Sequence, residues 1–310
     1  MSDTMVGLRR QIDGAGDLQS VVRTMKALAA SSIGQYEQSV NALADYARAV
    51  ELGLSVCFRE NPPVGLMGEQ KRTRQTGACG AVVFGSDQGL VGQFNEVIAD
   101  FAVKTLSARP GRHTVWAVGE RVQSRLADTG LALGGFFPVP NSIKAITPLV
   151  GKILLESEAA HSRGTIHELQ IFYNRPTSRA IYAPVNQRLL PLDEIWRSEL
   201  AILTWPTGNL PEVIGRGGAT LRSLIHEYLF ISLFRACAES LASENASRLT
   251  AMQRAEKNID ELLKDLNRHF HQLRQSGIDE ELFDVISGFE ALADKPAARE
   301  GHAGTPHIAL

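Results

Sequence analysis

The last part of the sequence carries one helical pattern that is too long for a globular domain. Residues 219–292 contain no proline, and their only glycines are Gly277 and Gly288. A helix of that length spans on the order of 110 Å, whereas a compact domain is about 30 Å across. One side of this helix is formed by positions at alternating three- and four-residue steps, namely Leu241, Asn245, Leu249, Met252, Ile259, Leu262, Leu266, Phe270 and Leu273. The segment therefore predicts a long helix whose apolar side needs a partner.

A second helical pattern, near the N-terminus, provides that partner. Its apolar positions recur with a mean step of about 3.5 residues, which is the period of a coiled coil. They are Leu8, Ile12, Ala15, Leu18, Val22, Met25, Ala29, Ile33, Tyr36, Val40, Leu43, Ala47, Val50 and Leu54. A plain amphipathic helix on a globular core is the alternative, and the length of the pattern counts against it.

The segment between the two helices shows alternating strand and helix patterns. Residues 57–77 contain Pro62, Pro63 and several glycines, which is typical of a linker. The sequence then predicts strands at 81–84, 114–118, 166–173 and 180–192, and helices at 94–106, 120–127 and 146–161. This alternation predicts a small, open, Rossmann-like α/β sheet with mainly parallel strands.

The expected fold class is therefore α/β, with a Rossmann-like open α/β domain inserted between the helices of a long antiparallel coiled coil. The expected divisions are a coiled-coil helix at 1–56, a linker at 57–77, the α/β domain at 78–205, a second coiled-coil helix at 206–292 and a flexible tail at 293–310.

The helix lengths also predict how the two helices align. Because the ends of the inserted domain must lie close together, Leu54 is expected beside Ala219, and equal rise then places Met25 beside Arg248. The C-terminal helix outruns the N-terminus by about 20 residues. The overhang, residues 274–292, still carries apolar side chains, so we expect other chains to cover it.

Charge and cysteine content exclude several classes of function. A net charge of -2 over 310 residues indicates no bulk electrostatic partner, and we expect no nucleic-acid binding. Cys57, Cys79 and Cys237 form no CxxC pair, so we expect reduced thiols and neither a disulfide framework nor a metal site. No apolar run reaches the roughly 18 residues needed to cross a bilayer, so we expect no direct membrane insertion.

The sequence contains no established catalytic or cofactor-binding motif. Gly85, Gly89 and Gly92 lie between a strand and a helix but do not form GxGxxG, and no GxxxxGK[ST] occurs. The stretch VIGRGGATLRSL at 213–224 has the shape of a KH loop, but no strand follows it. We therefore expect no catalytic, cofactor-binding or metal-binding residues. A nucleotide-binding α/β enzyme remains an alternative.

Three separated parts of the chain resemble the gamma subunit of F-type ATP synthases. The stretch LRRQIDGAGDLQSVVRTMKALAAS at 8–31 is similar to the N-terminal helix motif of that family. SDQGLVGQFN at 86–95 resembles its SDRGLCGGFN loop. ESLASENASRLTAM at 239–252 and LRQSGIDEELFDVISGFEAL at 273–292 are similar to its C-terminal helix.

The loop also departs from the family pattern. Gln88, Val91 and Gln93 stand where the family usually has Arg, Cys and Gly. These differences imply a divergent branch, such as the sodium-translocating bacterial type.

The resemblance implies a non-catalytic rotor subunit in a central stalk. In such proteins the coiled coil turns inside a hexamer of alpha and beta subunits, and the α/β domain joins the epsilon subunit and the membrane c-ring. The chain would transmit the torque that couples proton or sodium translocation to ATP synthesis or hydrolysis. We expect it at the cytoplasmic face of a bacterial cell membrane. From residue patterns alone, a coiled-coil scaffold that does not rotate is the alternative.

The resemblance also implies which residues contact partners. Arg274 and Gln275 match a pair that contacts a loop of the catalytic ring through charge-assisted hydrogen bonds. Met25 matches a shaft methionine near the lever of the beta subunit. The loop residues expected to face that lever are Asp87, Gly89, Leu90 and Gly92. The apolar bearing at the tip of the shaft includes Ile278, Leu282 and Ile286.

Overall fold

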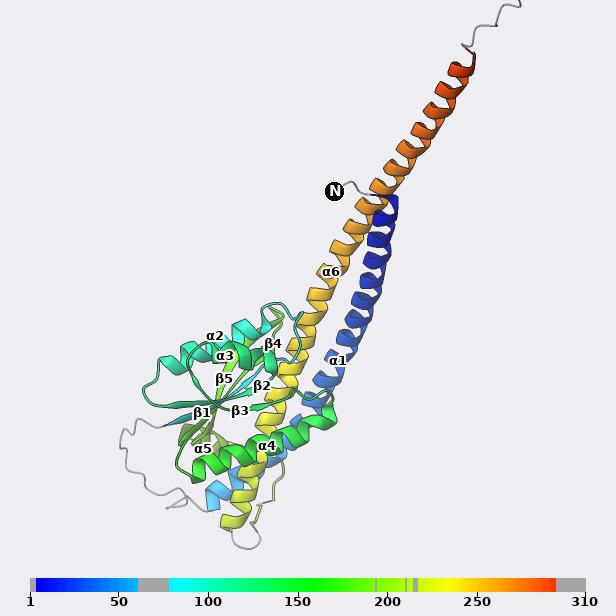
Figure 1. Cartoon of the computed structure of the whole chain (residues 1–310). Helices are drawn as coiled ribbons and strands as arrows, with labels where there is room; N and C mark the ends of the chain where they lie inside the picture. Colours follow the sequence, from blue (N-terminus) through cyan, green and yellow to red (C-terminus); the bar gives the residue numbers. More distant parts are fainter. Residues whose placement is uncertain (1–3, 61–77, 193, 210, 214–216, 294–310) are drawn as a thin grey trace, which may run out of the picture. The chain divides into compact units, whose positions relative to one another are not determined.

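The structure is a computed structural model, and it describes residues 4–60, 78–192, 194–209, 211–213 and 217–293. The chain divides into two compact units. We call Met1–Val21 together with Glu256–Leu310 the two-helix unit, and Val22–Ala255 the sheet unit. Figure 1 labels the helices and strands of both units.

Two long helices begin and end the described chain. Helix α1 (Met5–Glu60) has 56 residues and helix α6 (Gly217–Ala293) has 77. Neither contains proline, so no residue interrupts their backbone hydrogen bonds. In the two-helix unit the Gln19 side-chain amide donates a hydrogen bond to Asp260. In the sheet unit the Tyr46 hydroxyl donates to Glu227 over 2.8 Å, which is the pairing that equal rise predicts.

Two positions predicted to lie on the helix seam are wrong. Leu18 is 60% exposed and Leu262 is 50% exposed, although other predicted positions such as Leu8 are buried. The neighbouring residues Gln19 and Leu263 are half-buried instead. Alternating three- and four-residue steps can be placed in more than one order along a helix. Only contact with the opposite helix selects the order that is buried.

The expected overhang of the C-terminal helix is confirmed. Every side chain from position 274 to position 290 is exposed. The Leu292 side chain and residues 294–310 lie outside the described part of the chain, and so do residues 1–3. The predicted pairing of Met25 with Arg248 stays a prediction.

The sheet unit is built on five strands in the order β3-β2-β1-β4-β5. Their bounds are β1 Cys79–Phe84, β2 His113–Val118, β3 Ala132–Phe137, β4 Glu168–Pro176 and β5 Tyr182–Leu190. The pairs β1-β2, β1-β4 and β2-β3 are parallel, and β4-β5 is antiparallel. The mainly parallel sheet expected from the sequence is therefore confirmed.

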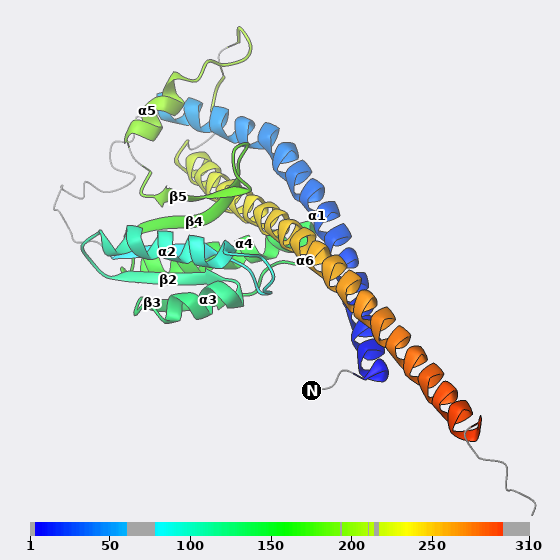
Figure 2. The ribbon, with the colours of Figure 1, turned by 90° about the horizontal axis from the view of Figure 1, so that it is seen from above.

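Helices cover both faces of this sheet. Alternate residues of β1 point to opposite faces of the sheet. On one face, Ala81 and Val83 pack with α2 (Phe94–Ser107) and α3 (Glu120–Ala127). Val82 and Phe84 pack with α4 (Ile143–Ser162) and with α6. Figure 2 shows β5 as the sheet edge that lies toward α6 and α1. The first half of α6 is thus part of the core of the sheet unit.

The sequence patterns miss strand β3 and helix α5 (Glu194–Ile202). Strand β3 reads ALGGFF, and its two glycines weaken the strand pattern. A Cβ atom at Gly134 would lie 3.2 Å from the Trp116 indole and 2.4 Å from Thr114 Cγ2. The edge strand therefore depends on close packing against β2 rather than on its own propensity.

Helix α1 also continues past the boundary expected at residue 56. It ends at Glu60, because Cys57 and Phe58 are buried against α5 and α6. The Phe58 and Trp196 rings meet edge to face with 5.9 Å between their centroids. The rest of the expected linker, residues 61–77, lies outside the described residues. The five-part division of the chain stays a prediction.

Cys57, Cys79 and Cys237 are buried, and they form no disulfide bond within the part of the chain that the structure describes. Burial raises the pKa of Cys79 to about 11, and burial also raises the pKa of Cys237. These thiols therefore serve as packing groups. Among the described residues, no helix has the length and apolar character required to span a membrane, and no cluster of His, Cys, Asp or Glu is arranged to hold a metal ion.

Candidate functional site: two partner-facing surfaces

The first candidate surface is the uncovered end of α6 in the two-helix unit. Its large apolar side chains are between 46% and 76% exposed, and they are Ile278, Leu282, Phe283, Val285, Ile286 and Phe289. Ile278, Leu282, Ile286 and Phe289 repeat at three- and four-residue steps, so they form one continuous stripe. Arg274 and Gln275 precede this stripe and are exposed as well. An apolar stripe of this length needs a covering surface from another molecule.

The second candidate surface is the Ser86–Gly92 loop, which connects β1 to α2 in the sheet unit. Both carboxylate oxygens of Asp87 accept backbone hydrogen bonds, from the N–H of Glu120 and from the N–H of Val139, each over 2.9 Å. Asp87 therefore ties the loop to the start of α3 and to the segment after β3. Its carboxylate points into the fold, so its role within this chain is to hold the loop.

The base of the loop is held by a second set of buried contacts. Asn95 accepts a hydrogen bond from the Ser86 N–H over 2.9 Å and donates one to the Ser86 hydroxyl over 2.8 Å. A Cβ atom at Gly85 would lie 2.3 Å from Val122 Cβ and 2.7 Å from the Asn95 side-chain oxygen. Only glycine allows this approach of the strand end to α3. The loop is therefore rigid at its base.

The outward side of the loop is formed by Leu90 and its neighbours. Leu90 has a positive φ of 62° and is 63% exposed, whereas Val91 is buried. Gly92 also has a positive φ, of 57°, which suits glycine. A Cβ atom at Gly89 would meet only an Arg121 nitrogen, at 3.9 Å. The loop thus presents Leu90, an exposed apolar side chain held by its backbone, to whatever approaches.

A charged pair lies beside this loop on α6. Arg248 and Glu244 form an ion pair over 2.7 Å, and both side chains are nearly buried. Burial raises the pKa of Glu244, the Arg248 guanidinium opposes that rise, and Asp87 adds to it. The loop therefore rests on a helix face that carries a desolvated charge.

The predicted contact residues are divided between the two units. Asp87, Gly89, Leu90, Gly92 and Met25 belong to the sheet unit, and Met25 is half-buried on α1. The other five, Arg274, Gln275, Ile278, Leu282 and Ile286, belong to the two-helix unit. Each unit therefore contributes its own candidate surface, and the contact of either surface with a partner stays a prediction.

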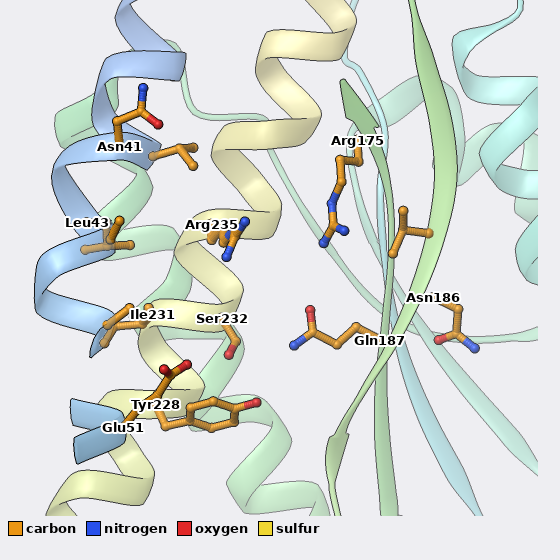
Figure 3. A pocket seen from close by; sticks show the side chains of 14 residues that line it. Asn41, Leu43, Glu51, Arg175, Asn186, Gln187, Tyr228, Ile231, Ser232 and Arg235 are labelled. Atoms are coloured by element: carbon orange, nitrogen blue, oxygen red, sulfur yellow. The ribbon is translucent and has the colours of Figure 1, made fainter. Parts of the chain in front are cut away.

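The sheet unit also contains a cavity of about 490 Å³ between α1, α6 and the strands β4 and β5. Arg175 and Gln187 reach into it from the strands, and Arg235 lines it from α6 (Figure 3). Both arginines donate to the same carboxylate, that of Glu239, over 2.8 Å each. The two guanidinium groups therefore share one carboxylate, and the Glu51 side chain adds a second carboxylate to the lining of the cavity.

Comparison with known proteins identifies the family. A family model described as ATP synthase matches residues 4–292. The ATP synthase gamma chain of a Nocardioides species is 28% identical over 303 residues, which cover 94% of this chain and 97% of the relative. The chain belongs to the ATP synthase gamma-chain family. The gamma chain of Clostridium pasteurianum is 26% identical over 300 residues, which cover 94% of this chain and 99% of that relative.

Solved structures share the fold of this gamma chain. A chain of the Euglena gracilis mitochondrial ATP synthase structure that includes F1 and the c-ring gives a TM-score of 0.62 at 15% identity, with 97% of this chain and 99% of that chain covered. A rotor structure of the same organism gives a TM-score of 0.58 at 16% identity, with 88% of this chain and 98% of that chain covered. A central-stalk structure of the Tetrahymena thermophila mitochondrial ATP synthase gives a TM-score of 0.54 at 19% identity, with 76% of this chain and 99% of that chain covered.

Family membership confirms the fold class and the central-stalk role expected from the sequence. A gamma chain is a non-catalytic subunit of ATP synthase, so the alternative of a nucleotide-binding enzyme is wrong. What the sequence did not reveal is the set of polar contacts between α6 and the sheet, made by Glu239, Ser243 and Ser247. Their four-residue spacing on a helix was the available signal.

Proposed function

We propose that this gamma chain turns inside the ring of alpha and beta subunits of an F-type ATP synthase, and that the ring encloses residues 274–290 of α6. One observation carries the proposal: the apolar stripe Ile278–Phe289 is exposed, and no other residue that the structure describes covers it. A sleeve of partner side chains would bury that stripe and still allow rotation, because apolar contact is non-directional.

Rotation of this shaft would couple ion translocation at the membrane c-ring to nucleotide binding by the beta subunits. A rod whose sides differ presents a different surface to each beta subunit at every angle. Shaft angle can change nucleotide affinity only if the rod binds the conformers of the beta subunits unequally. Arg274 and Gln275, at the start of the uncovered segment, would form and break charge-assisted hydrogen bonds with the ring once per step.

The sheet unit would supply the remaining contacts. Leu90 would meet the lever of a beta subunit, since it is the exposed apolar residue of the loop. Gly89 and Gly92 would shape the turn, Asp87 would hold it in place and Met25 would lie near the same lever. The epsilon subunit and the c-ring would attach to the α/β sheet, and the assembly would lie at the cytoplasmic face of the cell membrane.

Three residues in and beside the Ser86–Gly92 loop bear on which ion the complex transports. Gln88, Val91 and Gln93 favour a divergent branch, and the sodium-translocating bacterial ATPase is the candidate. Because ion choice is made in the membrane ring, the test is ion uptake into vesicles that contain the whole complex. ATP-driven uptake of sodium, but not of protons, supports this branch, and uptake of protons alone rejects it.

Purification of the complex tests the proposed function itself. The chain, tagged at its N-terminus, should copurify with alpha and beta subunits, with one copy per catalytic ring. A stable homodimer that lacks those subunits would instead support the non-rotating scaffold. A cross-linker placed at Leu282 should capture alpha or beta subunits, and capture of a second copy of this chain would reject the sleeve.

A further inference from the structure

Three buried polar residues lie in line on the face of α6 that meets the sheet. Glu239, Ser243 and Ser247 follow each other at four-residue steps, so they occupy one stripe of the helix. All three are less than a tenth exposed, and Ser243 is completely buried. Polar groups in such a position need hydrogen-bond partners. We call these three residues the polar stripe.

The residues of the polar stripe bond to two parts of the α/β fold. Glu239 accepts a hydrogen bond from Arg175 of β4 over 2.8 Å. Ser243 donates to the backbone carbonyl of Asn174, also in β4, over 3.0 Å. Ser247 donates to the backbone carbonyl of Val91 in the Ser86–Gly92 loop, over 2.5 Å. The stripe therefore connects the helix to strand β4 and to the loop that follows β1.

The partners of the polar stripe are themselves held in place. The Asn174 side chain is buried and donates to the Phe94 carbonyl at the start of α2, over 3.1 Å. Arg175 also donates to the Tyr173 hydroxyl and lies over that ring, with its Cζ 5.5 Å from the centroid. These second contacts attach the partners of the polar stripe to the sheet and to the start of α2.

Packing and hydrogen bonds both hold α6 on the sheet. Leu233, Cys237 and Leu241 bury apolar surface against the sheet, where close-packed side chains interdigitate. The hydrogen bonds add directional contacts, which weaken steeply when their angle or distance changes. Toward β5, the cavity of about 490 Å³ takes the place of tight packing between α1 and the strands (Figure 3).

We propose that Glu239, Ser243 and Ser247 form the joint that transmits torque between the α/β sheet and the α6 shaft of the rotor. The inference rests on the proposed function, since a joint carries torque only in a chain that rotates. Three directional bonds along one helix face resist both rotation of α6 about its axis and sliding along it. Force applied to the sheet would then reach the shaft with little slack.

The test uses the assembled complex with the double variant Ser243→Ala/Ser247→Ala and, separately, Glu239→Gln. Ser157→Ala is the matched control, because Ser157 is equally buried but bonds to Leu154 within its own helix, over 2.9 Å. Spin labels at Lys104→Cys on α2 and Arg254→Cys on α6, both exposed, report the spread of distances between sheet and helix. The native cysteines are buried and remain unlabelled.

We expect the double variant to widen this distance distribution about twofold and to lower ions pumped per ATP hydrolysed about threefold. ATP hydrolysis and the control should stay near wild type. An unchanged distribution and pumping ratio would overturn the joint. Equal changes in the distance distribution and in the pumping ratio of Ser157→Ala would also overturn the joint, because a general loss of stability would then explain the effects of both variants.

Two further outcomes remain informative. If the double variant does not assemble, the single variants Ser243→Ala and Ser247→Ala are measured in the same way, and wild-type values in both reject the joint. If the wild-type chain itself fails to copurify with alpha and beta subunits, the proposed function fails. Failure of the joint alone, in a complex that assembles and hydrolyses ATP, leaves the proposed function intact.

Discussion

Arg248 lies 2.7 Å from the Glu244 carboxylate, four residues away on α6, and both side chains are nearly buried beside the Ser86–Gly92 loop. Burial disfavours the charged carboxylate more than the guanidinium favours it, so the pKa of Glu244 is raised above its ordinary value of 4.5. The folded sheet unit therefore binds a proton at this position more tightly than the unfolded chain does.

The raised pKa of Glu244 predicts how stability changes with pH. The stability that protonated Glu244 adds to the folded chain is fully present below the unfolded pKa of 4.5. It is lost as pH rises through the higher folded pKa. Compared with Glu244→Gln, the free energy of unfolding of the wild type should therefore fall as pH rises above 4.5. Urea unfolding of both chains across that range measures the difference. A difference that is constant with pH would contradict the assignment.

Leu262 and Leu263 give a direct test of the seam between α1 and α6. Leu263 is half-buried, so Leu263→Ala should lower the free energy of unfolding by about 1 to 2 kcal/mol. Leu262 is 50% exposed, so Leu262→Ala should change it by no more than about 0.5 kcal/mol. The two variants remove the same atoms from adjacent positions. The reverse order of effects would place the seam one residue away.

Gly85 should tolerate no side chain, and Gly89 is its natural control. Gly85→Ala would push a Cβ atom to within 2.3 Å of Val122, so the loop or α3 must move, at a cost of about 2 to 3 kcal/mol. Gly89→Ala meets only an arginine nitrogen at 3.9 Å and should be nearly neutral. Thermal unfolding distinguishes the two, and equal melting temperatures would show that the loop base is not tightly packed.

Leu282 should matter for assembly but not for folding. It is 58% exposed, so Leu282→Asp should change the stability of the isolated chain by about 0.5 kcal/mol or less. In the complex it would place a charge in the apolar sleeve, and recovery of alpha and beta subunits on a tagged chain should fall. Glu280→Gln, two residues away and also exposed, is the control. Undiminished recovery with Leu282→Asp would mean that nothing covers the stripe.

Arg274 and Gln275 should affect coupling more than assembly. Replacing both with Ala removes charge-assisted hydrogen bonds at the start of the uncovered helix end, while the apolar stripe is left in place. We expect the complex to form normally and to pump fewer ions per ATP hydrolysed. Gln272→Ala, also exposed, should leave both quantities unchanged. A wild-type pumping ratio in the double variant would remove the role assigned to this pair.

The candidate site shows how far sequence reasoning reaches. The exposed stripe from Ile278 to Phe289 followed from helix length alone, because a helix that outruns its partner must leave its end uncovered. The sequence places the loop correctly between a strand and a helix, but in the structure Asp87 holds the loop with both of its oxygens, and Leu90 is its exposed apolar residue. Which side chain of a loop points outward depends on backbone angles that residue type does not specify.

The sequence by itself determined the two long helices, the alternation of strands and helices between them, and the uncovered apolar end. Each of these follows from periodicity or length, which are local properties of the chain. Only the tertiary structure decided that Leu263 rather than Leu262 is buried, and that Ser243 and Ser247 bond to carbonyls of Asn174 and Val91. The two serine hydrogen bonds join residues that are 69 and 156 positions apart, and the burial of Leu263 depends on how the two long helices pack. No local pattern in the sequence records such contacts.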